Sequence, residues 1–125
     1  MADIKEIGIN DPALADAQRR IAEHNPGLDL AKGIAADRLR VIEVHENGAR
    51  LATFACGRLA KDILRVYAVH ADSQRGDVVK GAMQPLEDWA EGQGAKQIVI
   101  DTQRPGMLAK LARSRRLLVS WQIGG

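Results

Sequence analysis

The residues best placed to do chemistry lie in a turn near the middle of the chain, at 72–76. This turn follows an apolar stretch, carries Gly76, and precedes a segment in which apolar residues recur at helical spacing. A helix that begins after such a turn directs its free backbone amides at an anion, most often a phosphate group. Arg75 within the turn and Lys80 shortly after it would add positive charge. The pattern therefore predicts a phosphate site.

Two apolar stretches flank this turn and would hold it within a sheet. The stretch 63–70 is apolar on both faces, which favours a central strand. After the turn, helical spacing runs from about 76 to 92, and Pro85 inside this helix removes one backbone donor. A short apolar run at 97–100 then predicts a second buried strand.

The N-terminal part of the sequence predicts a strand, a helix and a hairpin. The strand covers 3–9 and the helix covers about 12–24. The segment 26–37 is left open between a short helix and a packed loop. Two apolar stretches then flank Asn47-Gly48, a pair that favours the positive φ values of a type I′ hairpin turn.

The C-terminal part predicts one more helix, starting at Pro105-Gly106, and a final strand at 117–123. The resulting order of elements is strand, helix, open segment, three strands, helix, strand, helix, strand. We therefore expect an α/β (α+β) fold, in one domain that covers 1–125, because this length builds one modest core.

Composition places the chain among globular proteins, since 46% of its residues are apolar and 27% are charged. No apolar run approaches the roughly 20 residues that span a membrane, and the start of the sequence lacks the pattern of a signal peptide. Cys56 is the single cysteine, which excludes an internal disulfide and fits a reducing compartment, so we expect a cytoplasmic protein. One cysteine and three scattered histidines lack the spacing of a metal site, so no metal is expected.

Positive charge gathers toward the end of the sequence. Residues 1–37 carry seven acidic and four basic side chains (net −3), 38–94 carry eight of each, and 95–125 carry six basic and one acidic (net +5). A solvated cationic edge and an anion-binding face both fit this pattern. Nucleic-acid binding is a weaker alternative, because 3% aromatic residues leave few stacking surfaces. Its cations would be Arg104, Lys110, Arg113, Arg115 and Arg116.

The stretch 69–102 resembles, without gaps, the acyl-CoA region of the GNAT family of N-acetyltransferases. The run 69–72 (VHAD) matches a Val-His-Pro-Asp-like run of that family, and Gln74-Arg75 matches the start of its pyrophosphate loop. Residues 98–102 match the strand that follows the helix of this region in that family. The helix and its end match at Leu86, Trp89, Ala90, Gly94 and Ala95.

The resemblance implies a GNAT-like fold, with a mixed, mostly antiparallel central sheet and helices on both faces. It also implies acetyl-CoA as cofactor and an unidentified amine as acceptor. Among the implied cofactor residues, Thr102 stands where the family often has a polar residue near the pantetheine arm. The full set is Val69, Gln74, Arg75, Gly76, Lys80 and Thr102.

The loop itself departs from the family's pattern, Gln/Arg-x-x-Gly-x-Gly/Ala. When the pattern is laid on 74–79, its two glycine positions hold Asp77 and Val79. Glycine lets backbone amides approach a pyrophosphate, whereas a side chain obstructs it and an aspartate repels it. The alternative interpretation is that Gly76-Asp77 is a turn and a helix cap, and that the cofactor has been lost.

Direct acetyl transfer needs a base for the amine, an acid for the thiolate and a polarised thioester. Where many GNAT enzymes carry a tyrosine as the acid, this sequence carries Ala112, and Tyr67 is predicted to be a half-buried strand residue. The candidate bases are His70 and Asp101, which end neighbouring strands beside the implied cofactor site. Cys56 is predicted to be a small buried residue and not a nucleophile.

Glu43, His45 and Glu46 lie on one predicted strand. The odd spacing of the two glutamates places them on opposite faces, so they do not form a catalytic pair. His45 is predicted to be a surface residue or a satisfied polar one.

Three functions remain open at this point. The first is an acyl-CoA-dependent N-acetyltransferase, in which the altered loop and the missing acid reduce or abolish activity. The second is a non-catalytic GNAT-like protein, for example an internal virion protein of a short-tailed phage, which would bind a protein partner or a second copy of itself. The third, and the weakest, is a nucleic-acid-binding module that uses the basic C-terminal third.

Overall fold

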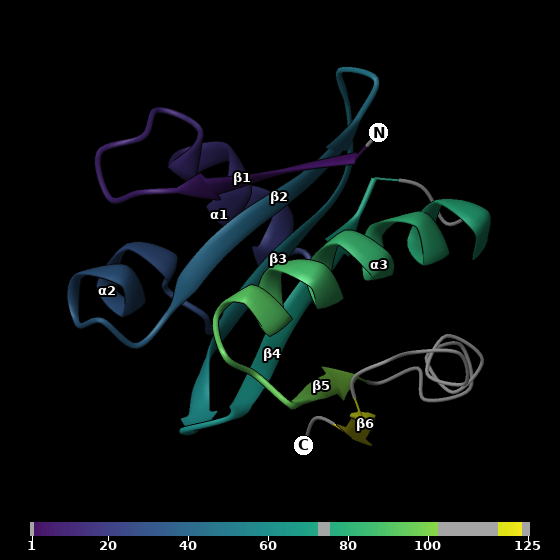
Figure 1. Cartoon of the computed structure of the whole chain (residues 1–125). Helices are drawn as coiled ribbons and strands as arrows, with labels where there is room; N and C mark the ends of the chain where they lie inside the picture. The colour runs from purple at the N-terminus through teal and green to yellow at the C-terminus, as the bar shows by residue number, and fades with distance from the viewer. Residues whose placement is uncertain (1, 73–75, 103–117, 124–125) are drawn as a thin grey trace.

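The computed structural model describes the backbone of residues 2–72, 76–102 and 118–123, and the side chains within 3–58, 60–72 and 81–100 (Figure 1). The described strands and helices follow one another in the order expected from the sequence. Their bounds are β1 Ala2–Ile7, α1 Leu14–Ala22, α2 Leu30–Ala35, β2 Arg40–Glu46, β3 Ala49–Ala60, β4 Ile63–Ala71, α3 Gly76–Gly92, β5 Gln97–Thr102 and β6 Leu118–Ile123.

The strands form one sheet in the order β1-β2-β3-β4-β5-β6. Each of the first three strands pairs antiparallel with the next, whereas β4 and β5, and then β5 and β6, pair in parallel. The expected mixed, mostly antiparallel sheet is therefore confirmed. The central position expected for the strand at 63–70 is confirmed as well, since β4 lies between β3 and β5.

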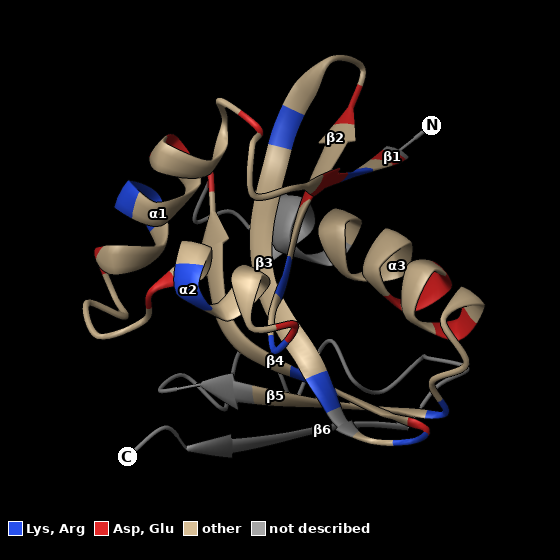
Figure 2. Cartoon of the chain, turned by 90° about the vertical axis from the view of Figure 1, so that its left-hand side faces the viewer, with Lys and Arg blue, Asp and Glu red and all other residues tan. Residues whose placement is uncertain are grey.

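Helices cover both faces of the sheet, as Figures 1 and 2 show from two directions. On one face α3 packs on a core that includes Phe54, Leu86 and Ile98. On the other face α1 and α2 pack on a second core that includes Ile21 and Leu30. The sheet thus separates the molecule into an α3 side and an α1 side, names that we keep below.

The hairpin between β2 and β3 turns at the predicted residues. Asn47 has φ 53° and Gly48 has φ 80°, the pair of positive values that a type I′ turn requires. The open segment 26–37 contains a short helix, α2. Its N-cap is Asp29, whose carboxylate accepts a hydrogen bond from the Lys32 amide at 3.0 Å.

The two predicted elements nearest the N-terminus, a strand at 3–9 and a helix at about 12–24, differ from the observed ones by one or two residues at each end. The first strand ends at Ile7, and the first helix spans Leu14–Ala22. The reason is a turn before the helix, in which Asp11 accepts a side-chain bond from the Ala13 amide at 2.9 Å and a backbone bond from Leu14 at 3.0 Å. This turn occupies the residues that would otherwise extend both elements.

Helix α3 agrees with its predicted span and continues through Pro85. It ends where predicted, because Gly94 adopts φ 89° and the Ala95 amide returns to the Ala90 carbonyl at 3.0 Å. The helix predicted from Pro105 lies outside the described residues. The final predicted strand is present as β6.

Gly57 marks a close approach between β3 and the residues before β2. A methyl group at this position would overlap the carbonyl oxygen of Arg38 and lie 3.2 Å from the ring of Tyr67. We expect Gly57→Ala to destabilise the protein by about 1–3 kcal/mol, because backbone must move to admit the methyl group. Urea denaturation measures this loss.

The matched control is Gly27→Ala, since no atom lies within 4 Å of a methyl group there. We expect its effect to stay within about 0.5 kcal/mol. Equal losses for the two variants would contradict the close approach at Gly57.

Candidate active site

The parallel strands β4 and β5 separate along their length. Their register runs from Ile63 opposite Gln97 to Val66 opposite Ile100, and no further pairs follow among the described residues. Beyond that point β4 continues to Ala71 along β3, and β5 continues along β6. The edge of β4 from 67 to 71 is therefore not paired with β5, so its backbone groups on that side can bind a ligand.

The end of this unpaired edge leads to the N-terminus of a helix. After Ala71 the chain makes a short connection, and α3 begins at Gly76 (Figure 1). The first amides of a helix lack intrahelical partners and carry partial positive charge. The backbone thus places an open strand edge next to the N-terminus of α3, and the phosphate site at this helix end stays a prediction.

His70 lies on the unpaired part of β4 and faces the α1 side. It is opposite Thr53 in β3, and its Nε2 atom lies 3.4 Å from Oε2 of Glu23, at the end of α1. Only 15% of its side chain is exposed. Its Nδ1 atom is buried and has no hydrogen-bond partner within the described part of the chain. A buried polar atom without a partner costs about 1–3 kcal/mol.

Charged and polar side chains gather between α1 and the sheet. Arg20, which is 5% exposed, reaches from α1 to Glu43 on β2, with Nη2 at 3.0 Å from Oε2. A second bond joins Arg20 to the hydroxyl of Thr53 on β3. Glu43 also contacts Nε2 of His45 at 3.0 Å. We call these side chains, together with Asp16, Arg50 and Asp72, the α1 charge cluster.

Within this cluster, hydrogen bonds shift the pKa values of two side chains, Asp16 and Arg50. The bonds from Arg19 and then from Arg20 hold the pKa of Asp16 below its ordinary value. The hydrogen bond to Asp72 raises the pKa of Arg50 above its ordinary value. Both groups therefore keep their charges at neutral pH.

Sequence reasoning missed this cluster. It correctly placed Glu43 and Glu46 apart, since Glu43 is buried and Glu46 is exposed, but it gave Glu43 no partner. The partner, Arg20, lies three residues after the buried Ala17 and directly before the buried Ile21 in α1, which puts it on the buried face. A charged residue on the buried face of a helix and another inside a buried strand together indicate an ion pair.

Only some of the predicted cofactor residues can be placed. Val69 lies on the unpaired edge of β4, and its side chain packs partly buried against the core on the α3 side. Gly76 begins α3 and Lys80 follows in the same helix, as do Asp77 and Val79. These four are described by their backbone alone. Gln74 and Arg75 lie outside the described residues.

The two predicted bases, His70 and Asp101, do not lie opposite each other in the pairing of β4 with β5. Asp101 and Thr102 lie in β5, beyond its last pair with β4, and they pair with β6. Their side chains are not described. His70 therefore belongs to the α1 side by observed contacts, whereas the role of Asp101 stays a prediction.

Two further candidates have structural roles. Tyr67 packs half-buried on the α1 side, and the guanidinium of Arg65 lies 4.7 Å from its ring centre, as predicted for a strand aromatic. Cys56 is buried, and its Sγ atom donates to the carbonyl of Arg40 at 3.5 Å. Burial raises the pKa of the Cys56 thiol to about 12, so it is not a nucleophile at neutral pH.

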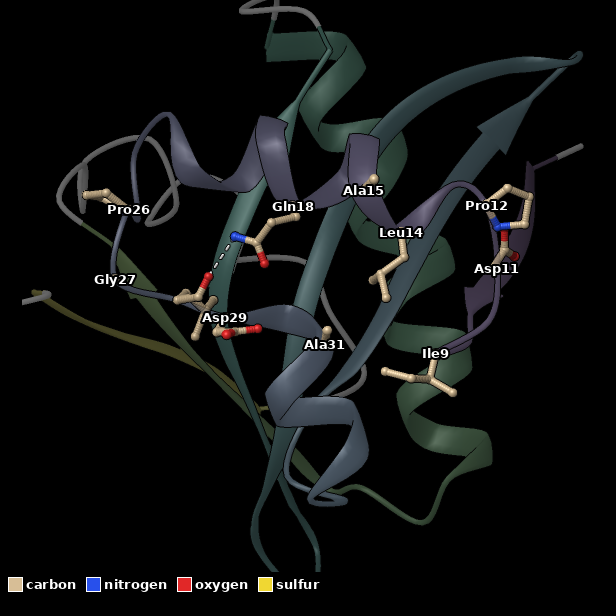
Figure 3. A pocket seen from close by; sticks show the side chains of 11 residues that line it. Ile9, Asp11, Pro12, Leu14, Ala15, Gln18, Pro26, Gly27, Asp29 and Ala31 are labelled. Atoms are coloured by element: carbon tan, nitrogen blue, oxygen red, sulfur yellow. Dashed lines mark hydrogen bonds between the residues drawn. The ribbon is translucent and has the colours of Figure 1, made fainter.

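A pocket of about 610 Å³ lies elsewhere, between the two connections that flank α1 (Figure 3). Its wall is mostly apolar and includes Ile9 and Leu14. Gln18 closes one side, because its amide donates to the Leu28 carbonyl at 2.8 Å and accepts from the Leu30 amide at 2.7 Å. None of the predicted site residues lines this pocket.

Two negative observations concern the described residues alone. They contain no group of three or more His, Cys, Asp and Glu side chains arranged to hold a metal ion. Their helices include none that combines the length and the apolar character needed to cross a membrane.

Comparison with known proteins gives matches among solved structures. No family model matches the sequence, and no curated protein does. An aminoglycoside acetyltransferase from an uncultured soil metagenomic sample, in complex with sisomicin, aligns with a TM-score of 0.63 at 13% identity, over 87% of this chain and 82% of that one. A predicted acetyltransferase from Clostridium acetobutylicum, with acetyl-CoA, aligns with a TM-score of 0.58 at 15% identity, over 92% of this chain and 91% of that one.

A third structure, ribosomal-protein-alanine N-acetyltransferase from Brucella melitensis biovar Abortus, aligns with a TM-score of 0.58 at 13% identity, over 80% of this chain and 79% of that one. The chain is thus similar in fold to acetyltransferases that differ in what they acetylate. The GNAT-like fold expected from the sequence is confirmed.

The burial of Cys56 has a consequence for thiol chemistry. We expect the folded protein to resist the thiol reagent DTNB at pH 8, because the thiol is inaccessible and protonated. In denaturant, one equivalent should react. An added cysteine at the exposed position Ala15 (Ala15→Cys) is the control and should react at once in the folded protein. Rapid labelling of Cys56 in the native state would contradict its burial.

Proposed function

We propose that this protein is a divergent N-acetyltransferase that binds acetyl-CoA and acetylates an amine. The observation that carries the proposal is the separation of β4 from β5, which leaves an open strand edge directly before the N-terminus of α3. The matching acetyltransferases support it, one of them solved with acetyl-CoA and another with CoA. They act on different amines by name, so the acceptor of this protein stays open.

Several of the residues present fit the cofactor, whereas Asp77 and Val79 in the loop do not. The unpaired edge of β4 around Val69 offers amides and carbonyls to the pantetheine arm, and the first amides of α3 offer positive charge to the diphosphate. Arg75 and Lys80 would add to that charge, Gly76 would let the backbone come close to the diphosphate, and Thr102 would flank the arm from β5. When bound, acetyl-CoA supplies an acetyl group activated as a thioester.

His70 is the base in this proposal. It takes the proton that the acceptor amine loses as the amide bond forms, and its buried Nδ1 atom is available for that proton. Glu23, at 3.4 Å from Nε2, then stabilises the imidazolium. Because Ala112 replaces the expected acid, the thiolate leaves without a tyrosine donor, and we expect slow turnover.

Acetyl-CoA binding tests the cofactor part of the proposal. A concentration 100 times Kd should stabilise the protein by about 2.7 kcal/mol and raise its melting temperature. The variant Asp77→Gly plus Val79→Gly should bind about tenfold tighter by calorimetry, a gain of about 1.4 kcal/mol, because it removes a repelling charge and a side chain from the loop.

Calorimetry is the right measurement for the double variant, because each glycine also weakens the helix by about 1 kcal/mol. Asp77→Asn is the companion variant, since it removes the charge and keeps the size. If millimolar acetyl-CoA gives neither heat nor a thermal shift in the wild type and in the double variant, the proposal is overturned.

Loss of His70 tests the catalytic part. We expect His70→Gln to lower the rate of acetyl transfer about 10²–10⁴-fold at pH 7 without changing acetyl-CoA affinity. Part of the rate should return near pH 10, where a lysine-like amine, with a pKa of about 10.4, loses its own proton. His24→Gln, at an exposed histidine, is the control. An unchanged rate of acetyl transfer in His70→Gln would exclude His70 as the base.

A non-catalytic binding protein is the second candidate, and the loop favours it. Asp77 occupies the first turn of α3, where its carboxylate can complement the free amides that a diphosphate would otherwise bind. The internal virion protein of a phage is one such role. Absence of acetyl-CoA binding, together with a defined oligomer or a partner that co-purifies, would support this candidate.

A further inference from the structure

Arg50, near the start of β3, contacts three carboxylates from three other parts of the fold. Its Nε and Nη2 atoms donate to the two oxygens of Asp72, at 2.9 and 2.8 Å. Its Nη1 atom lies 3.5 Å from Oδ2 of Asp16 on α1 and 3.8 Å from Oε2 of Glu43 on β2. One guanidinium therefore links α1, β2 and the residue that follows β4.

The two ends of this link are fixed independently. Asp16 also accepts a bond from Nε of Arg20 at 2.9 Å, which joins it to the buried part of the α1 charge cluster. The Asp72 amide donates to the carbonyl of Leu51 at 2.9 Å, which holds the start of the β4–α3 connection against β3. Movement at either end therefore changes the geometry around Arg50.

We propose that Arg50 is a positioning residue that couples α1 to the β4–α3 connection. A planar guanidinium that binds a carboxylate with two parallel bonds fixes its direction as well as its distance. Because Arg50 holds Asp72 in this way and contacts Asp16 with its remaining nitrogen, a displacement of α1 alters the direction in which the chain leaves β4.

The consequence for ligands rests on the proposed function. Acetyl-CoA would bind after Asp72, at the N-terminus of α3, and the acceptor would approach His70 from the α1 side. A link between these two places makes each ligand change the affinity for the other by the same factor.

Arg40 supplies a matched control. It lies at the start of β2 and binds Glu6 with the same two-bond geometry, at 2.9 and 2.6 Å. It also contacts Gln93 after the end of α3, at 2.6 Å, and therefore belongs to the opposite end of that helix. Arg40→Met should lower the free energy of unfolding, as Arg50→Met does, but should leave the link between α1 and Asp72 intact.

The decisive experiment is a mutant cycle that needs no cofactor. Asp16→Asn, Asp72→Asn and their combination are compared by urea denaturation in the wild type, in Arg50→Met and in Arg40→Met. We expect the two substitutions to be non-additive by at least about threefold in the unfolding equilibrium constant in the wild type and in Arg40→Met. In Arg50→Met the effects of Asp16→Asn and Asp72→Asn should be additive to within about twofold in the unfolding equilibrium constant.

Additive effects in the wild type, or coupling that persists in Arg50→Met, would overturn the proposal. If Arg50→Met does not fold, Arg50→Lys replaces it, because a lysine keeps the charge but cannot form the paired bonds, and the coupling should then fall below that of the wild type.

A second measurement tests the role in the cofactor site. Arg50→Met should weaken acetyl-CoA binding at least about threefold by calorimetry, whereas Arg40→Met should stay within about twofold. Equal affinities in Arg50→Met and the wild type would overturn that role. If the wild type binds no acetyl-CoA, the proposed function fails, while the mutant cycle still decides whether Arg50 couples the two elements.

Discussion

The buried ion pair between Arg20 and Glu43 is the interaction on which the α1 side depends. Both side chains are almost fully buried, and removal of either would leave an unpaired charge at a cost of about 3–5 kcal/mol. The pair fixes one rotation of α1 about its axis, because Arg20 must face β2. That rotation sets where Asp16 meets Arg50 and where Glu23 meets His70, so the geometry of the candidate site follows from one pair.

The α3 side is organised differently, by packing and by strand register. An apolar core of residues such as Phe54 and Leu86 holds α3 against the antiparallel strands. β5 pairs with β4 over four residue pairs only, and this short pairing is what opens the edge of β4. The two faces of the sheet thus contribute different parts: the α3 side offers a helix end and a strand edge, and the α1 side offers titratable groups.

Much of the fold could be predicted from the sequence because local signals determine it. Asn47-Gly48 located a hairpin, and regular apolar spacing located α3. The segment at 26–37 stayed open because a helix of six residues gives little periodicity. The site was predictable only in part: His70 was identified from its place at a strand end, whereas its contact with Glu23 and the link through Arg50 join residues far apart in sequence, whose partners become apparent only in the folded structure.

The antiparallel meander has a consequence for how the chain folds. Four of the six strands, and both helices of the α1 side, are complete in sequence by Ala71, and each of these strands pairs with the next one along the chain. β5 instead reaches its partner through a crossover that includes all of α3. Loop closure of this kind is slower than hairpin formation. We therefore expect the α1 side and its charged residues to assemble first during synthesis, before α3 and β5 pack against the sheet.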